Sequence, residues 1–361
     1  MPFRSVVSAF VLALLCNAAP ASAVPLFAHE YGVTCQECHT AIPHLNAFGQ
    51  YFLANGYRIP GLEPGRAFPI AIKANLAYSS EPDPTGLPKA IVDEVEVFLA
   101  GLVGPRTNYF FEQYLIDGGD HGLTREAWVN YRATPDAARV PIWLQAGSFT
   151  LPLPIDPETF RESAQHYTVF DQTVGNNPFN FFDPKIGVQV GVGSALQGAS
   201  VRVFAGPGHD RQSGLPTTGT DVMGYGQQVI GPVTLSTYRY QGSRPDVADL
   251  LDRFSRQGFG VTYAAGRWTS ESVLQTGWDS SVDGLGFGSS GGFTQLRYEI
   301  GPRLFALARY EGTSDTAGFA RDGVLLLGMR VTQNARFTVE DVIQHVPQTK
   351  HTLNAQYTVG Y

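Results

Sequence analysis

The sequence predicts a mainly β protein: a transmembrane antiparallel β-barrel of about sixteen strands, preceded by a small helical segment at the N-terminus. Three observations lead to this fold class. The chain begins with the pattern of an export signal, apolar and polar residues alternate in short runs through most of its length, and the outward faces of these runs end in tyrosine or tryptophan. We therefore divide the chain into residues 1–23, 24–66 and 67–361.

Residues 1–23 have the three parts of a secretory signal peptide. Arg4 begins a charged region, an apolar run ends at Cys16, and Ala21-Ser22-Ala23 has the form of a cleavage site. Cleavage there removes Cys16 from the exported chain. The full sequence carries a net charge of −7, and loss of Arg4 makes it more negative. This balance argues against nucleic acid and against an anionic membrane surface as partners.

The two remaining cysteines form a C-x-x-C-H motif at Cys35, Cys38 and His39. In this pattern the thiols form thioether bonds to the vinyl groups of a haem, and the adjacent histidine is the proximal iron ligand. A disulfide and a zinc site are the alternatives. Zinc fits poorly because His39 directly follows Cys38 and would struggle to join it in one tetrahedral shell. A redox disulfide usually belongs to a βαβ context, which this sequence lacks. We therefore predict one covalently bound haem c.

A short apolar helix is expected after the motif. Pro43 can open it, and the turn residues Asn55-Gly56 can end it. Its apolar stripe consists of Leu45, Phe48 and Phe52. Residues 24–66 are close to the length below which a domain needs a covalent or cofactor-based staple, and haem can provide one. A segment of this length covers only part of a porphyrin. We therefore expect another part of the chain to cover the rest.

The sixth iron ligand is less well defined by the sequence. Beyond Met1, the only methionines are Met223 and Met329, both in the barrel region. His29 and His44 are the candidate distal ligands near the motif. We prefer His29, because it precedes the motif and can fold across the distal face. The alternatives are a surface role for each histidine and an open or water-bound iron.

Period-two alternation defines the strands from residue 68 onward. Near the start of this region, one face of a predicted strand is apolar and contains Ile70, Ile72, Leu76 and Tyr78. The other face contains Ala71, Lys73 and Asn75. A soluble sandwich also has such strands. The signal peptide, the aromatic ends and a final strand ending in Tyr361, which resembles the assembly signal of bacterial outer-membrane barrels, favour the membrane barrel.

Sixteen alternating runs give an even strand number, as in bacterial single-chain barrels. They begin near residues 68, 91, 107, 123, 141, 184, 199, 221, 233, 254, 268, 291, 303, 321, 335 and 350. Residues 150–183 form the longest stretch without a predicted strand. A loop of this length is usually functional or disordered. It is expected either to fold into the barrel lumen or to remain exposed outside.

The arrangement of signal peptide, one C-x-x-C-H motif, a short helix and then a porin resembles the fused outer-membrane monohaem cytochrome–porin family of iron-oxidising bacteria. The residues that carry the resemblance are Cys35, Cys38, His39, Pro43, Leu45, Asn46, Phe48, Gly49 and Asn55-Gly56-Tyr57. The resemblance is specific across residues 25–60 and architectural over the barrel. It implies an electron-transfer protein, formally an iron:cytochrome c oxidoreductase, that takes electrons from extracellular Fe(II) and passes them to periplasmic c-type cytochromes.

Elementary geometry agrees with that role. An even-stranded barrel in outer-membrane lipid has both ends of its chain in the periplasm, so the haem segment enters from that side. The apolar band is about 25 Å tall, and a haem inside the lumen shortens the distance to reagents on both sides. An outward electron conduit and a passive solute porin with a haem plug are the alternative functions. No dedicated iron site is visible, and an acidic run at Asp246, Asp249 and Asp252 fits a solvated loop.

Overall fold

The fold is described from a computed structural model that covers most of residues 26–360. Gaps lie at residues 42–43, 56, 60, 63–69, 83–87, 136–137, 159–160, 173, 175–176, 178, 195–197, 208–218, 246–250, 281–285, 316–317 and 346–348, and the side chains of Leu26, His29, Ala54, Pro82, Pro88 and Pro245 are also outside the described part. The predicted signal peptide, the predicted domain boundary at residue 66, and Pro43, Asp246, Asp249 and Tyr361 therefore lie outside the described residues.

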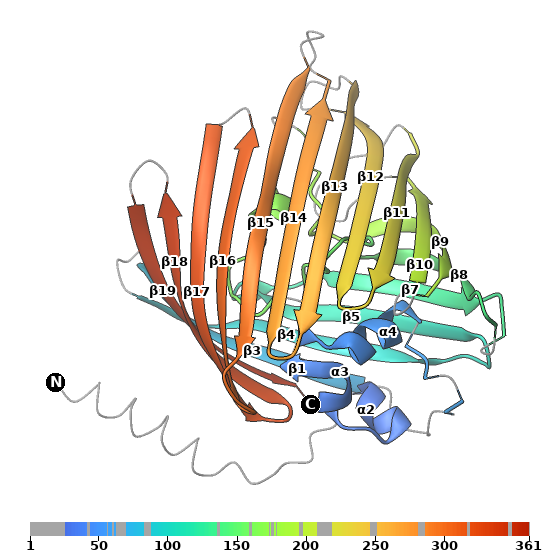
Figure 1. Ribbon diagram of the computed structural model, residues 1–361, viewed down its shortest axis with the longest axis horizontal. Coiled ribbons are helices and arrows are strands. Elements are labelled where there is room, and N and C mark those ends of the chain that lie inside the picture. Colours follow the sequence, from blue (N-terminus) through green and yellow to red (C-terminus); the bar gives the residue numbers. More distant parts are fainter. Residues whose placement is uncertain are drawn as a thin grey trace.

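Sixteen long strands close into one antiparallel barrel within the described part of the chain. Each strand pairs with its neighbour in sequence, and the barrel closes where β19 pairs with β3 (Figure 1). The long strands are β3 (Ile70–Pro82), β4 (Pro88–Leu102), β5 (Thr107–Asp117), β7 (Thr124–Arg132), β8 (Ile142–Phe149), β9 (Lys185–Gly193), β10 (Gly198–Gly206), β11 (Asp221–Ile230), β12 (Val233–Pro245), β13 (Leu251–Ala265), β14 (Trp268–Asp279), β15 (Phe287–Glu299), β16 (Leu304–Asp315), β17 (Gly318–Thr332), β18 (Ala335–His345) and β19 (Thr349–Gly360). The two-residue strand β6 (Asp120–His121) extends the pairing of β5.

The predicted strands are confirmed. Every predicted start lies within four residues of an observed one, and the largest difference is at β15, which begins at Phe287. A closed barrel leaves no open sheet edge, so the soluble sandwich is excluded.

The barrel is apolar outside and polar inside, the reverse of a soluble protein. The predicted faces of β3 are confirmed: Ile72 is 43 % exposed, whereas Asn75 on the opposite face is buried. On the neighbouring strand, Glu96 is 0 % exposed and pairs with Lys73 at 2.6 Å. Alternation of this kind places apolar side chains against lipid and polar ones around the lumen.

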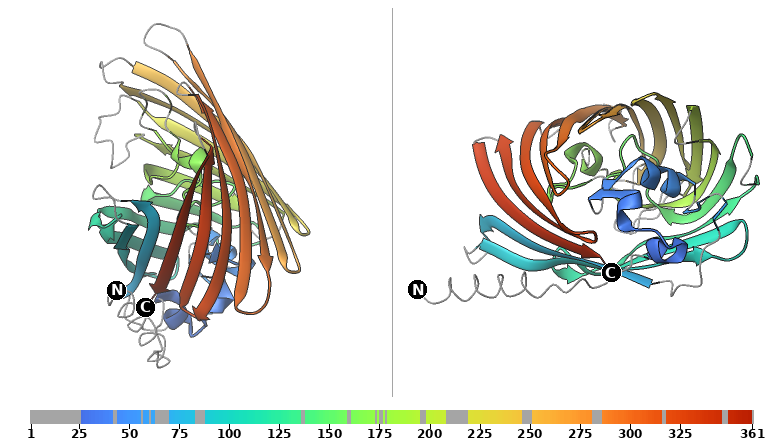
Figure 2. Two further views of the ribbon diagram at one scale, coloured as in Figure 1. Left: turned by 90° about the vertical axis from the view of Figure 1, so that its left-hand side faces the viewer. Right: turned by 60° about the horizontal axis from the view of Figure 1, so that its bottom comes forward.

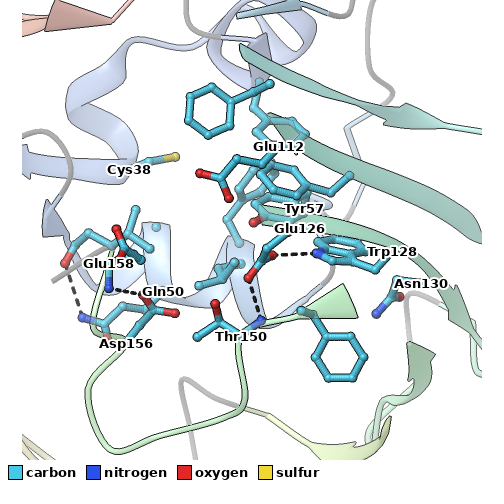
Figure 3. Close-up of a pocket in the computed structure, with 18 of the residues that line it drawn as sticks. Cys38, Gln50, Tyr57, Glu112, Glu126, Trp128, Asn130, Thr150, Asp156 and Glu158 are labelled. Atoms are coloured by element: carbon cyan, nitrogen blue, oxygen red, sulfur yellow. Dashed lines mark hydrogen bonds between the residues drawn. The ribbon is translucent and has the colours of Figure 1, made fainter. Parts of the chain in front are cut away.

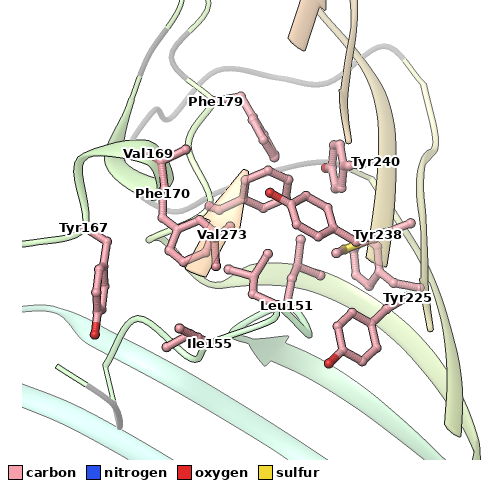
Figure 4. Packing of buried hydrophobic residues seen from close by; sticks show 14 of the residues in the cluster. Leu151, Ile155, Tyr167, Val169, Phe170, Phe179, Tyr225, Tyr238, Tyr240 and Val273 are labelled. Atoms are coloured by element: carbon pink, nitrogen blue, oxygen red, sulfur yellow. The ribbon is translucent and has the colours of Figure 1, made fainter. Parts of the chain in front are cut away.

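The long loop of residues 150–183 folds into the barrel, which settles the alternative left open by the sequence. It contains the short helix α5 (Thr168–Asp171) and packs against strands β10 to β15 (Figure 4). The buried cluster that it forms with the wall includes Leu151, Leu153, Ile155, Tyr167, Val169, Phe170, Phe179 and Phe181 of the loop and Tyr238, Tyr240, Phe254, Val273 and Phe293 of the strands. We call residues 150–183 the lumen plug.

The N-terminal segment also lies within the ring of strands, near the end of the barrel where β19 ends (Figure 2). It consists of helix α2 (Leu26–Tyr31), helix α3 (Cys35–Cys38), the strand pair β1 (His39–Ala41) and β2 (His44–Leu45), and helix α4 (Ala47–Ala54). None of the described helices is long and apolar enough to cross a membrane.

Candidate functional site

The C-x-x-C-H motif begins in the short helix α3 and is held in place by one side chain, Asn46. The Asn46 amide nitrogen donates to the carbonyl oxygens of Gln36 at 3.1 Å and Glu37 at 2.9 Å. Its backbone N–H donates to the Cys38 carbonyl at 2.8 Å. Its side-chain oxygen accepts from the backbone N–H of Gly49 at 2.9 Å, which caps helix α4. Asn46 therefore fixes the motif to the helix that follows it.

The predicted helix start at Pro43 is wrong, because helix α4 begins four residues later, at Ala47. The residues before helix α4 form a strand instead: His44 and Leu45 make up β2, which pairs with β1, the strand that begins at His39 of the motif. In this pairing, residues 44–45 use backbone hydrogen-bonding groups to bond to β1, so those groups are not available for helical hydrogen bonds. Asn46 then caps the helix that follows.

Helix α4 approaches the motif closely at Gly49. A Cβ atom at this position would lie 2.1 Å from the Cys38 carbonyl oxygen and 2.9 Å from the Leu45 side chain. Only glycine allows the two backbones to come so near.

We expect Gly49→Ala to loosen the motif. In an exposed helix, replacing glycine with alanine would raise the free energy of unfolding by about 1 kcal/mol. Here the clash reverses the sign of the effect, and we expect the free energy of unfolding to fall by about 1–3 kcal/mol. Hydrogen exchange at the amides of Asn46 and Gly49 should become faster. Gly224→Ala is the matched control, because nothing lies within 4 Å of a Cβ built there. Unchanged exchange in the Gly49 variant would contradict the assignment.

Stacked aromatic rings join the N-terminal segment to the barrel wall. The Tyr57 ring stacks on Phe27 at 4.5 Å between ring centres, and on Phe110 of β5 and Trp128 of β7 at 5.5 Å. Phe52 of α4 packs edge-on against Phe27 at 5.1 Å. Tyr57 adopts a left-handed backbone with φ of 57°, a conformation that costs energy outside glycine and that this packing supports.

A cavity of about 400 Å³ lies beside the motif, inside the barrel (Figure 3). Its size falls in the range of cofactor sites. Cys35, Cys38 and His39 line it from the N-terminal segment. The lumen plug covers it through residues 150–154, Asp156 and Glu158, and strands of the wall complete it. We expected the short N-terminal segment to leave one side of the site open and another part of the chain to cover it. The lining of this cavity agrees with that expectation.

The two cysteines are free thiols, with Cys35 only 4 % exposed. Burial raises the pKa of the Cys35 thiol. Burial, followed by the charges of Cys35 and Glu37, raises the pKa of Cys38 to about 11. A redox dithiol needs the opposite, a lowered thiol pKa. In the part of the chain that is described, no group of three or more histidine, cysteine or acidic residues is arranged to hold a metal ion.

The walls of the cavity suit a porphyrin. Apolar and aromatic side chains surround the motif, among them Phe27, Leu45, Phe52, Leu53 and Tyr57. Asn130 of the wall lies across the cavity from Cys38, whereas the Glu112 carboxylate lies beside Cys38 in Figure 3. A porphyrin is a large apolar ring with its charged groups on one edge, so the apolar part of this lining is the part that matches it. Cys35 and Cys38 would hold a haem c covalently, and His39 would be the adjacent iron ligand.

The candidate distal ligands lie in different surroundings. His44 does not line the cavity; it is buried, and its Nδ1 is 2.6 Å from the Thr40 hydroxyl oxygen. Burial holds its pKa down to about 4, so its ring is neutral at physiological pH. His29 lies in α2, and its side chain is outside the described part. Met223 packs in the cluster around the lumen plug, whereas Met329 is exposed on the outer face. The preference for His29 stays a prediction.

Several lining residues were not found from the sequence. They come from the barrel strands and include Lys73, Glu96, Glu112, Arg125, Glu126 and Arg202. Glu126 is fixed by two hydrogen bonds, accepting from the Trp128 indole at 2.9 Å and from the Thr150 backbone at 2.6 Å (Figure 3). Arg125 pairs with Glu158 of the lumen plug at 3.0 Å. In the sequence, these lining residues differ from their neighbours only in being polar residues within a predicted strand.

Comparison with known proteins identifies the fold only. No family model matches the sequence, and no curated protein matches it. Among solved structures, the chain is similar to an anion-selective porin from Comamonas acidovorans, with a TM-score of 0.61 and 12 % identity over 81 % of this chain and 98 % of the other. The outer-membrane channel DcaP of Acinetobacter baumannii gives a TM-score of 0.57 and 12 % identity, covering 81 % of this chain and 96 % of that one. OmpF of Salmonella typhi, in complex with daunomycin, gives a TM-score of 0.57 and 11 % identity, covering 81 % of this chain and 97 % of that one.

Proposed function

We propose that the protein is an outer-membrane electron carrier that holds one covalent haem c inside a porin-like barrel. The observation that carries the proposal is the position of Cys35, Cys38 and His39 on one cavity, enclosed by the N-terminal segment, the lumen plug and the barrel wall. When bound, the haem supplies a one-electron couple. The protein holds it, limits its contact with water and tunes its potential.

The outer-membrane location is supported by the apolar exterior of a closed barrel, which needs lipid around it. The N-terminal segment lies at the end of the barrel where β19 ends (Figure 1). For an even-stranded barrel that end faces the periplasm. A periplasmic c-type cytochrome is therefore the proposed partner on that side.

Extracellular Fe(II) is the proposed electron donor, and electrons run inward. The resemblance of residues 25–60 to the cytochrome–porin family supports this choice. The iron would act as a substrate at the outer side.

A passive solute porin is the second candidate, because the fold is that of known porins. A sixteen-stranded barrel is wide enough for an aqueous channel. The apolar packing of the lumen plug favours electron transfer over this alternative, since it fills part of the space through which solutes would pass.

Rapid mixing of the oxidised, haem-loaded protein with Fe(II) tests the donor. The haem absorption bands should change to those of the reduced form. Dithionite is the positive control, and a protein without covalent haem is the blank. Reduction by dithionite but not by Fe(II) would exclude inward iron oxidation and favour the outward conduit.

A further inference from the structure

One arginine of the barrel wall faces the cavity from a fixed position. Arg202 lies on β10 in a row of directly paired inward residues: Trp143 on β8, Gly191 on β9, Arg202 and then Tyr225 on β11. Trp143, Arg202 and Tyr225 all line the cavity. The row therefore carries one charged side chain between two aromatic ones.

Gly191 makes this arrangement possible. A Cβ atom there would lie 2.2 Å from the Trp143 ring, so any other residue would displace the indole. The Arg202 guanidinium carbon lies 5.4 Å from the centre of the Trp143 ring and 5.7 Å from that of Tyr225. Cation–π contacts on two sides hold the guanidinium in place without neutralising it.

Unlike several other inward arginines, Arg202 forms no ion pair with any described residue, although the Asp156 carboxylate of the lumen plug lines the same cavity and interacts with its charge at longer range. Arg256 pairs with Asp279 at 2.7 Å, and Arg297 pairs with Glu162 at 2.6 Å. Arg125, which lines the same cavity, pairs with Glu158. Among the described residues, no carboxylate lies within ion-pair distance of Arg202. A charge in such a partly enclosed site is stabilised by a counter-ion, and a guanidinium prefers a carboxylate or phosphate.

Neutral amides surround this end of the cavity. Asn130, Gln145 and Gln189 are direct neighbours on β7, β8 and β9, and Gln227 adds a fourth amide from β11. They can donate to an anion and add no opposing charge. Asn130, at this end, lies on the opposite side of the cavity from Cys38 in Figure 3.

The chemistry of a haem matches this layout. Its vinyl groups and its two propionates are on opposite edges of the ring. If the vinyl edge is bonded to Cys35 and Cys38, the carboxylates point away from the motif. We propose that Arg202 binds a haem propionate, assisted by the amides around it. This inference rests on the proposed haem and names Arg202 as a positioning residue that also raises the potential of the iron.

The test compares Arg202→Gln and Arg202→Lys with Arg267→Gln, which removes the same charge from an exposed turn. All are purified with haem attached, and faster migration of unheated samples confirms the folded barrel. Loss of a positive charge near the haem favours the oxidised iron. We expect Arg202→Gln to lower the equilibrium constant for reduction of the haem iron about tenfold, which corresponds to a midpoint potential lower by about 59 mV. Resonance Raman spectra should show a shifted propionate bending band.

Arg202→Lys separates charge from geometry. It keeps the charge but loses the planar fork, so its potential should stay close to that of the parent while the propionate band shifts. Arg267→Gln should change neither. An unchanged potential and an unchanged band in Arg202→Gln would overturn the inference.

A free anion is the other source of the same chemistry. Chloride titration at constant ionic strength distinguishes it: a bound propionate makes the potential independent of chloride. A chloride-dependent potential in the parent that disappears in Arg202→Gln would show an open anion site and overturn the propionate assignment. Absence of covalent haem in the parent protein would instead overturn the proposed function, and the inference with it.

Discussion

Replacing Cys35 and Cys38 together with alanine is expected to abolish covalent haem. The two thioether bonds are the only covalent links that C-x-x-C-H allows, so nothing retains the haem in a denatured chain. When expressed with a c-type maturation system, the parent protein should keep a peroxidase-stained band after denaturing electrophoresis. The double variant should show the same band by protein stain and none by peroxidase stain.

The single variants are the internal controls. Cys35→Ala and Cys38→Ala each keep one thiol and should show weakened staining. His39→Ala keeps both thiols and should stain, but with a disturbed iron spectrum. An unstained parent protein of full length would contradict haem attachment. Faster migration of unheated samples shows whether each barrel has still assembled.

Removing most of the lumen plug is expected to turn the barrel into an open channel. With residues 157–182 replaced by a short Gly-Ser linker, single-channel conductance in a planar bilayer should rise about tenfold, because a sixteen-stranded barrel encloses an aqueous lumen once its apolar filling is gone. The linker leaves residues 150–154 at the cavity intact.

Point variants check that packing, and not loop length alone, restricts the lumen. Phe181 is buried between Phe179 and Tyr238, with ring centres 5.0 and 5.3 Å away. Phe181→Ala should cost about 3–5 kcal/mol of unfolding free energy and increase brief channel openings. Phe259→Ala, at an outward position of β13, is the matched control and should leave conductance unchanged. A parent protein that already conducts like a general porin would contradict the plugged lumen and favour the passive channel.

The barrel could be predicted from sequence because period-two alternation is a local signal. It located even the weakly alternating strand β14, which begins at Trp268. The start of β15 was displaced because Phe287 is followed by glycine and serine, which give no apolar face to detect. Local pattern therefore determined the strands, and the errors are confined to their ends, such as those of β4, β13 and β15.

The contents of the lumen could not be predicted in the same way. The plug is held by contacts between residues far apart in sequence, such as Glu162 with Arg297, and alternation carries no information about them. The motif was visible, but its partner Asn46 was assigned to a helix that begins too early. An asparagine before an apolar run is a helix-cap signal, and it could have corrected that start. Arg202 resembled any other inward polar residue until its neighbours were known.

The burial of Cys35 also constrains the order of biogenesis. A thiol that is 4 % exposed and lines a cavity inside the barrel is out of reach of an enzyme that must present a haem to it. The proposed attachment must therefore happen while residues 26–54 are still outside the lumen. Docking of the loaded segment then follows as a separate maturation step, which would make haem supply a checkpoint on the assembly of the finished barrel.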